Sequence, residues 1–219
     1  MPRAKREREV SFTKVKKKTK ESKRNLVNDI HRCIDSYKNI FIFVVENMRT
    51  TNFLKIRQKY KNTSRFFFGK NNLMAVALGR DKDKEYAKDL SKMCPCLKGQ
   101  CGLMFTNESK FSVIKFFEEF HEMDFTRCSQ IATKTIELSE GPLPQFPFSN
   151  EYQLRQLGLP TKLEKGVVKL ISDYTVCKEG EQLTAEQARL LKYLDIKMAT
   201  FKITLLGHWS KSDGFNLFN

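Results

Sequence analysis

Hydrophobic positions in the first half of the chain change periodicity several times, and each change predicts an element of secondary structure. The spacing of one helix face recurs at Leu26, Val27, Ile30, Cys33, Ile34 and Tyr37. A continuous β-favouring run over 39–45 predicts a strand that is buried on both faces. Further strands are predicted over 65–68 and 102–105. Further helices are predicted from a cap at Thr50 or Thr51 through Ile56, and over 73–78, 82–93 and 111–120.

This alternation is lost between about 122 and 196. There the pattern predicts a strand over 131–138, a strand pair over 167–171 and 174–177, and capping boxes that open helices at Asn150 and Thr184. A last strand is expected over 200–206. We therefore predict an α/β fold in which helices flank a β-sheet, formed by 21–122 plus 197–219, with a smaller α+β domain inserted over 123–196.

Charge divides the chain differently. The whole chain has 40 Lys and Arg against 25 Asp and Glu, a net charge of +15. Residues 1–24 hold eleven basic residues and three Glu, and 38–70 hold eight basic residues and one Glu, whereas 71–219 are nearly balanced. Such asymmetry favours a polyanion partner, because clustered Lys and Arg neutralise phosphates and release counterions. The alternative is a solvated basic face that serves only solubility.

Residues 1–20 are predicted to form a basic flexible arm that orders on a partner, because they combine many charges with few apolar residues. Its clusters Lys5-Arg6 and Lys16-Lys17-Lys18 also suit nuclear import signals. The chain has no apolar run of membrane-spanning length and no secretory signal pattern. We therefore expect no membrane partner.

Gly69-Lys70 resembles the end of a phosphate-binding P-loop, but Ser64 and Asn71 stand where that motif needs Gly and Ser or Thr. Another function of this turn is expected. Backbone N–H groups and Lys70 can meet a phosphate, the Asn amides can touch sugar or base edges, and a glycine can take φ > 0. The alternative is an ordinary turn between a strand and a helix.

Other candidate chemistry is weak. Cys94, Cys96 and Cys101 supply three thiols, but Cys128 and His121 are not at a zinc-knuckle spacing, so buried thiols are favoured. No nucleophile, base and oxyanion donor assemble, so we predict no catalytic site, no metal and no cofactor. Trp209 and Phe215 could stack on bases, although a terminal strand pair around 211–214 explains them better.

Several motifs together carry a family resemblance. Phe68–Met74, Leu97–Thr106 and Gly141-Pro142-Leu143 resemble the stalk-base family of the large ribosomal subunit, the universal L10 type that includes acidic ribosomal protein P-zero. The segments 154–161, 173–180 and 183–192 resemble more closely its assembly-factor branch, the mRNA turnover protein 4 group. The resemblance covers about 1–215 and implies an α/β rRNA-binding domain with an inserted second domain.

The resemblance implies a non-enzymatic ribosome biogenesis factor. It would bind large-subunit rRNA at the stalk base of pre-60S particles as a placeholder, and the mature stalk protein would later replace it. Implied partners are a neighbouring stalk-base ribosomal protein and a release factor of the dual-specificity-phosphatase type. Implied locations are the nucleolus and nucleus, with shuttling to the cytoplasm. The chain is expected to have the docking part of a stalk protein and to lack its recruiting part.

The resemblance places rRNA contacts on the arm, on the turn at 69–72, and on Lys98 with Gly99. The distribution of charge along the chain adds Lys55 and Arg57, on the helix expected after Thr51. The predicted RNA-binding residues are Lys14, Lys16, Lys17, Lys18, Lys20, Lys23, Arg24, Lys55, Arg57, Gly69, Lys70, Asn71, Asn72 and Lys98. Two alternatives stay open. A stalk protein that remains on mature ribosomes is disfavoured by the import-like clusters, and an RNA-decay enzyme is disfavoured by the lack of a carboxylate cluster.

Overall fold

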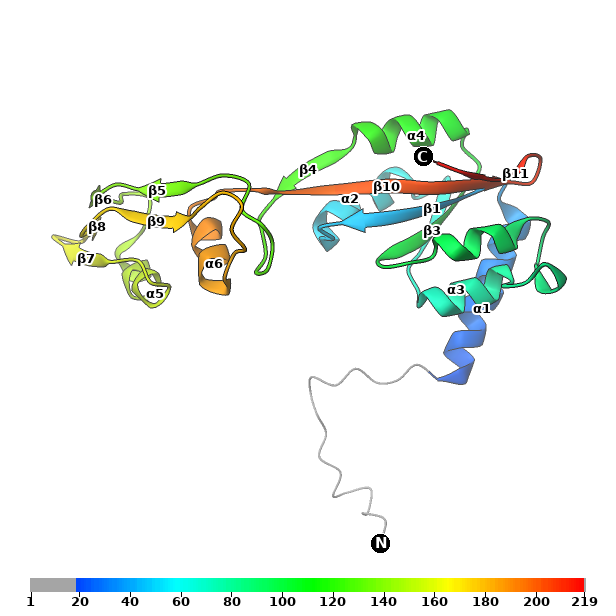
Figure 1. The fold of residues 1–219 in the computed structure, drawn as a ribbon, viewed down its shortest axis with the longest axis horizontal. Helices are drawn as coiled ribbons and strands as arrows, with labels where there is room; N and C mark the ends of the chain where they lie inside the picture. Colours follow the sequence, from blue (N-terminus) through cyan, green and yellow to red (C-terminus); the bar gives the residue numbers. More distant parts are fainter. Residues whose placement is uncertain (1–18, 219) are drawn as a thin grey trace, which may run out of the picture. The chain divides into compact units, whose positions relative to one another are not determined.

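A computed structural model describes residues 19–218, and its largest sheet joins strands that are far apart in the sequence (Figure 1). The strand order is β11-β10-β1-β3-β2, and β4 pairs with β10 beside this path. The strands are β1 (Asn39–Glu46), β2 (Ser64–Phe67), β3 (Cys101–Thr106), β4 (His121–Asp124), β10 (Ala199–Ser210) and β11 (Gly214–Leu217). Buried side chains from Ile40 through Phe43 confirm that β1 is buried on both faces.

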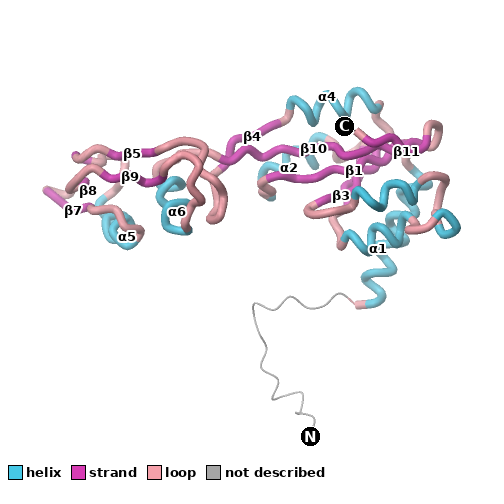
Figure 2. The backbone as a smooth tube through the Cα atoms, viewed as in Figure 1, coloured by secondary structure: helices cyan, strands magenta, loops and turns pink. Residues whose placement is uncertain are grey.

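The helices that accompany this sheet are α1 (Lys20–Ser36), α2 (Thr50–Lys59), α3 (Asn71–Leu78) and α4 (Lys110–Glu119). Helix α1 buries Ile30, Cys33 and Ile34, as the spacing predicts. The α/β fold class is therefore confirmed, and Figure 2 shows the mixture of helix and strand along the chain.

Two compact units divide the described chain. The first contains the described parts of Met1–Phe43, Lys61–Lys110 and Leu205–Asn219, and the second contains Val44–Tyr60 and Phe111–Thr204. Strands β1 and β10 contribute residues to both units. The predicted boundaries of an insert at 123 and 196 stay a prediction.

The second unit contains a hydrophobic core of its own, formed by thirteen buried residues between Ala132 and Met198. Around it lie a two-stranded sheet of β5 (Ile136–Leu138) and β9 (Tyr174–Cys177), and a three-stranded sheet in the order β6-β8-β7. The strands of that three-stranded sheet are β6 (Gly141–Pro142), β7 (Thr161–Glu164) and β8 (Val167–Leu170), and the helices beside this core are η4 (Phe148–Asn150), α5 (Glu151–Gln156) and α6 (Ala185–Tyr193). The second unit also contains α2, β4 and all of α4 except its first residue.

The helix expected over 82–93 is wrong. Two 3₁₀ turns, η2 (Lys82–Lys84) and η3 (Leu90–Cys96), stand in its place. The carbonyl oxygen of Lys88 accepts a hydrogen bond from Trp209 Nε1 at 2.9 Å, and Asp89 takes a left-handed φ of 67°. The left-handed φ of Asp89 interrupts a continuous helix at this point, and the Trp209 bond ties the Lys88 carbonyl to a distant strand.

Four other expectations about local structure are wrong. The strand expected over 131–138 covers only Ile136–Leu138, because Ile131 forms an isolated bridge to Gln182 instead. Strands β8 and β9 do not pair with each other; β8 pairs with β6 and β7, and β9 pairs with β5. Arg49 is the N-cap of α2, so neither threonine caps that helix. Asn150 is the N-cap of α5, as predicted, but its side chain makes no cap bond and the expected capping box is absent.

The capping box at Thr184 and the terminal hairpin are confirmed. Thr184 Oγ1 accepts from the backbone N–H of Gln187, whose side-chain Oε1 accepts from the N–H of Thr184. Strands β10 and β11 pair in antiparallel register, with Trp209 opposite Phe215. Trp209 is buried, so its ring is part of the core and does not offer a face to a base. Among the helices of residues 19–218, none is both long enough and apolar enough to cross a membrane.

His208 on β10 gives a prediction about stability and pH. The ring is buried against Phe41, Nε2 lies 3.1 Å from Asn39 Oδ1, and burial with nearby Lys110 lowers its pKa to about 4. The unfolded chain should protonate this residue near pH 6.5. The neutral ring therefore contributes stability that is complete above about pH 6.5 and is lost as the pH falls toward 4.

We expect denaturant unfolding at pH 7, 6, 5 and 4 to show a fall of about 1–3 kcal/mol that is attributable to this histidine. The control is His208→Gln, which keeps a hydrogen-bonding side chain but cannot titrate. Carboxyl groups titrate in both proteins, so the difference between the two pH profiles is the measurement. Identical profiles would contradict the prediction.

Candidate RNA-binding surface

The first turns of α1 present basic side chains to solvent. Thr19 is the N-cap of this helix, because its Oγ1 accepts from the N–H of Ser22 at 3.2 Å. Lys20, Lys23 and Arg24 follow it and are all exposed. Glu21 is the acidic residue of the first turn, and the three cations outweigh it, so this end of α1 has a net positive charge. The predicted contacts Lys14, Lys16, Lys17 and Lys18 lie outside the described residues.

The turn between β2 and α3 packs directly on α1. Only Phe68, Gly69 and Lys70 separate the two elements. A Cβ atom at Gly69 would lie 3.2 Å from Leu26 Cδ2 and 3.3 Å from Met74 Cγ. The expectation that Gly69 takes a positive φ is wrong, since it is not among the positive-φ glycines. Glycine is favoured here because a larger residue would crowd the contact with α1.

Helix α3 begins at this turn with an end suited to anions. Lys70 is its N-cap and makes no side-chain cap bond, while its carbonyl accepts from the N–H groups of Leu73 and Met74 at 2.8 and 3.0 Å. The N–H groups at the start of a helix have no carbonyl partner within the helix. The first turn of α3 contains no acidic residue, and Lys70 and Asn72 are exposed. The helix dipole and the Lys70 charge therefore both favour a phosphate at this position.

Asn71 links the turn to the segment that precedes β3. Its Nδ2 donates to the carbonyl oxygen of Gly99 at 3.0 Å, and its Oδ1 accepts from the Cys101 thiol at 3.3 Å. Gly99 has a positive φ of 69°, and Lys98 beside it is exposed. The side chain of Asn71 thus holds the Lys98–Gly99 loop next to the start of α3. Its polar atoms serve this positioning within the protein.

Replacing Asn71 with Ala should therefore disturb the surface without directly removing a charge. We expect the free energy of unfolding to fall by about 1 kcal/mol, because the carbonyl of Gly99 and the thiol of Cys101 lose their hydrogen-bond partner. Binding to large-subunit rRNA should weaken about three- to tenfold as the Lys98 loop is released. The matched control for stability is Asn72→Ala on the exposed side of the same turn, which should leave the melting curve unchanged even though Asn72 is itself a predicted contact. Melting curves and filter binding measure the two effects. Unchanged melting with Asn71→Ala would contradict the positioning role.

The predicted contacts Lys55 and Arg57 lie on α2, in the other compact unit. Lys55 Nζ is 2.7 Å from Glu122 Oε1, an ion pair that reduces the charge it can offer to a phosphate. Arg57 is exposed. Because α2 and the surface formed by α1, the turn and the Lys98 loop belong to different units, the role of these two residues stays a separate prediction.

Sequence reasoning missed Arg65, which lies on β2 next to α1. Its guanidinium is 3.8 Å from Asp29 on α1, and it also lies over the ring of Phe67, 5.0 Å from the ring centroid. This cation ties the strand to the helix that carries Lys23 and Arg24. The charge map contained Arg65, but only the tertiary structure shows which carboxylate it faces.

Cys94, Cys96 and Cys101 are favoured as protonated thiols. Cys94 donates to the carbonyl oxygens of Ala75 and Gly79, and burial raises the pKa of the Cys94, Cys96 and Cys101 thiols. Metal binding needs the thiolate form, which a raised pKa disfavours. Within residues 19–218, no group of three or more His, Cys, Asp or Glu side chains is placed to hold a metal ion.

Two family models match the chain in series. The model of ribosomal protein L10 matches residues 18–122, and the model of the insertion domain in 60S ribosomal proteins of the L10 type matches residues 126–196. The ribosome assembly factor mrt4 of Dictyostelium discoideum is 39% identical over 97% of this chain and 95% of its own length. The chain belongs to the Mrt4 branch of the ribosomal L10 family. The resemblance identified in the sequence is thereby confirmed.

Other relatives belong to both branches of this family. The ribosome assembly factor mrt4 of Schizosaccharomyces pombe is 40% identical over 96% of this chain and 92% of its own length. The large ribosomal subunit protein uL10 of Methanopyrus kandleri is 29% identical over 82% of this chain, but the match covers only 50% of that protein. The surface from Lys20 to Gly99 lies entirely within the part that matches ribosomal protein L10.

Proposed function

We propose that this protein is a ribosome assembly factor that binds large-subunit rRNA at the stalk base of pre-60S particles. The observation that carries the proposal is that three groups suited to binding anions lie in one compact unit. They are the exposed Lys20, Lys23 and Arg24 of α1, the start of α3 behind Lys70, and the Lys98 loop held by Asn71. All lie in the part that matches ribosomal protein L10.

Phosphate contacts account for how such a surface would bind. Lys and Arg side chains and helix N-termini position a protein on the sugar-phosphate backbone, and folded RNA is read largely through its shape and its 2′-hydroxyl groups. The arm outside the described residues adds eight Lys and Arg over 1–18. Binding alone is sufficient for this role, and no catalytic step is part of the proposal.

A placeholder mechanism is supported by the similarity to uL10, which covers 82% of this chain. Two proteins that share a docking domain would compete for one rRNA site, so the assembly factor would block the site until it is released. We propose that the mature stalk protein then takes its place, next to a neighbouring stalk-base ribosomal protein. Release would be assisted by a factor of the dual-specificity-phosphatase type. The expected locations are the nucleolus and nucleus, with passage to the cytoplasm.

The proposal is tested by finding where the protein sediments and what it touches. A tagged full-length protein should sediment with pre-60S particles and be missing from polysomes. Ultraviolet crosslinking should map to stalk-base rRNA, through peptides that contain α1 or the turn at Gly69. Presence in polysomes would favour the mature-ribosome alternative, and crosslinks confined to mRNA would favour the RNA-decay alternative.

The insertion segment is proposed to be dispensable for isolated rRNA binding. Asp124 on β4 is paired with Ala199 on β10, so the two ends of the segment already lie side by side as an antiparallel pair. Replacing 126–198 with a Gly-Asn-Gly turn should therefore close a hairpin. We expect rRNA affinity within about threefold of the full chain, measured by filter binding with circular dichroism as the folding control. A folded variant that no longer binds rRNA would contradict this division of labour.

A further inference from the structure

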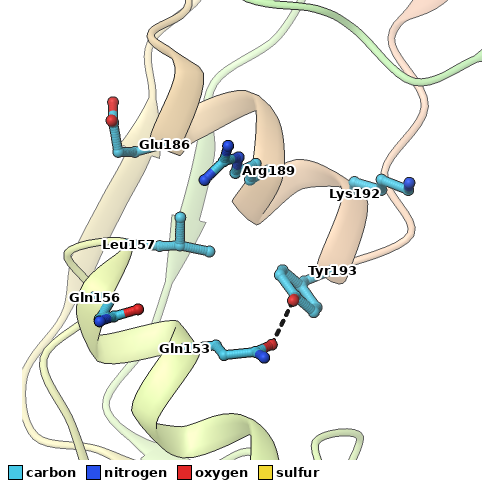
Figure 3. A pocket seen from close by; sticks show the side chains of 7 residues that line it. All are labelled: Gln153, Gln156, Leu157, Glu186, Arg189, Lys192 and Tyr193. Carbon is cyan, nitrogen blue, oxygen red and sulfur yellow. Dashed lines mark hydrogen bonds between the residues drawn. The ribbon is translucent and has the colours of Figure 1, made fainter. Parts of the chain in front are cut away.

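A groove of about 850 Å³ lies between α5 and α6 in the second unit (Figure 3). Gln153 and Leu157 line it from the side of α5, while Glu186, Arg189, Lys192 and Tyr193 line it from α6. The hydroxyl of Tyr193 donates to Gln153 Oε1 at 2.6 Å and bridges the two helices. The proposed rRNA contact does not use this groove, so it has no assigned role.

The charged side chains of this groove do not pack on the core, although Leu157 at its edge packs against the core and the Tyr193–Gln153 bond links the two helices. Helix α6 packs on the core through Leu190 and Leu191, and α5 packs through Leu154. Arg189, Lys192 and Tyr193 follow one another at helical i, i+3 and i+4 spacing on the other side of α6. They can therefore contact a partner without any change in the core.

Within residues 19–218, the two cations in the groove form no ion pair, unlike three other cations of the same segment. Arg155, Lys162 and Lys169 each lie within 3.6 Å of a carboxylate oxygen of Glu151 or Glu164. Arg189 and Lys192 are exposed and have no ion-pair partner among the described residues. Two positive charges face one carboxylate, Glu186, in the lining. The groove is thus complementary to a ligand that brings negative charge.

We propose that the groove between α5 and α6 binds a short acidic segment of a partner protein. Its carboxylates would pair with Arg189 and Lys192, and an apolar side chain would rest against Leu157 and the ring of Tyr193. Arg and Tyr are enriched where protein interfaces concentrate their binding energy.

Charge favours a protein partner over RNA. Residues 123–196 hold nine Lys and Arg against ten Asp and Glu, whereas nucleic-acid interfaces are strongly positive. Glu186 in the lining would repel a phosphate backbone. This inference is independent of the proposed rRNA docking, because the groove lies in the part that matches the insertion domain. The two can therefore fail separately.

Selection from a library of random twelve-residue peptides displayed on phage tests the proposal with the full chain and without rRNA. The variant Arg189→Glu/Lys192→Glu is used for counter-selection, so peptides that bind the basic arm are removed, since the arm is present in both proteins. The matched control is Lys134→Glu/Lys178→Glu, which makes the same charge change at two exposed residues outside the groove lining. Melting curves establish that both variants are folded.

We expect the selected peptides to be rich in Asp and Glu around an apolar residue. Their affinity should fall about tenfold or more in the groove variant and less than about twofold in the control. Selected peptides that are not acidic, or that both variants bind equally, would overturn the proposal. A twelve-nucleotide oligouridylate that binds the wild type but not the groove variant, with no acidic peptide selected, would overturn it in favour of RNA.

Discussion

Removal of residues 1–18 should weaken rRNA binding about ten- to a hundredfold at physiological salt while the folded part stays intact. The deletion removes eight Lys and Arg and two Glu. Each phosphate contact that is lost should make the dependence of log affinity on log salt shallower by about 0.7–0.9. Affinity measured across a salt series reports this directly, because uncharged contacts change the intercept and leave the slope.

The deletion has to stop at Lys18. Thr19 is the N-cap of α1, and its Oγ1 accepts a hydrogen bond from the backbone N–H of Ser22. A deletion through Lys20 would remove this cap and lower the free energy of unfolding by about 1 kcal/mol. The matched control replaces the Lys and Arg residues of 1–18 with Ser or Gln at constant length. If the salt slope stays at its wild-type value in both variants, the arm does not contact phosphate. Loss of nuclear accumulation is expected in parallel.

Gly69→Glu should weaken docking and stability together, whereas Lys70→Glu should weaken docking alone. At Gly69 the new Cβ would crowd Leu26 and Met74, which costs about 1–3 kcal/mol of stability. The new carboxylate would also repel a phosphate at the start of α3. Lys70 is exposed and makes no side-chain cap bond, so its replacement should change stability by less than about 0.5 kcal/mol.

Retention on purified pre-60S particles across a salt series measures docking, and melting curves of the free proteins measure stability. We expect both variants to lose about tenfold or more in retention, with a lowered melting temperature only for Gly69→Glu. Gly69→Ala separates crowding from charge, since it adds the Cβ without the carboxylate. Wild-type retention of Lys70→Glu would show that phosphate does not approach this turn.

Some features of the structure follow from short segments of the sequence alone. The strand at β1, the helix at α1 and the box at Thr184 follow from apolar spacing and capping chemistry within one short segment, which tertiary contacts then reinforce. The excess of positive charge over 1–70 is likewise a property of the sequence alone. For that reason the fold class could be predicted from the sequence, and a polyanion partner and most residues of the candidate surface could already be proposed from it.

Distant residues decided two of the wrong predictions, the helix over 82–93 and the pairing of β8 with β9. The Lys88 carbonyl bonds to Trp209, 121 positions away, in the segment where a helix is expected from the sequence and where Asp89 has a left-handed φ. Pairing of β8 with β6 and β7 depends on which strand edges meet, and local alternation carries no information about that choice.

The site shows the same division. Charge and spacing point to Lys20, Lys23 and Lys70, because a cation on a polar face is visible in the sequence. That Gly69 is crowded by Leu26, and that Asn71 holds Gly99 rather than offering a free amide, depends on side chains brought together across 28 to 43 positions. Local periodicity therefore determines which segments are helix, strand and basic surface. Long-range packing and hydrogen bonding determine which of those residues face a partner and which hold the others in place.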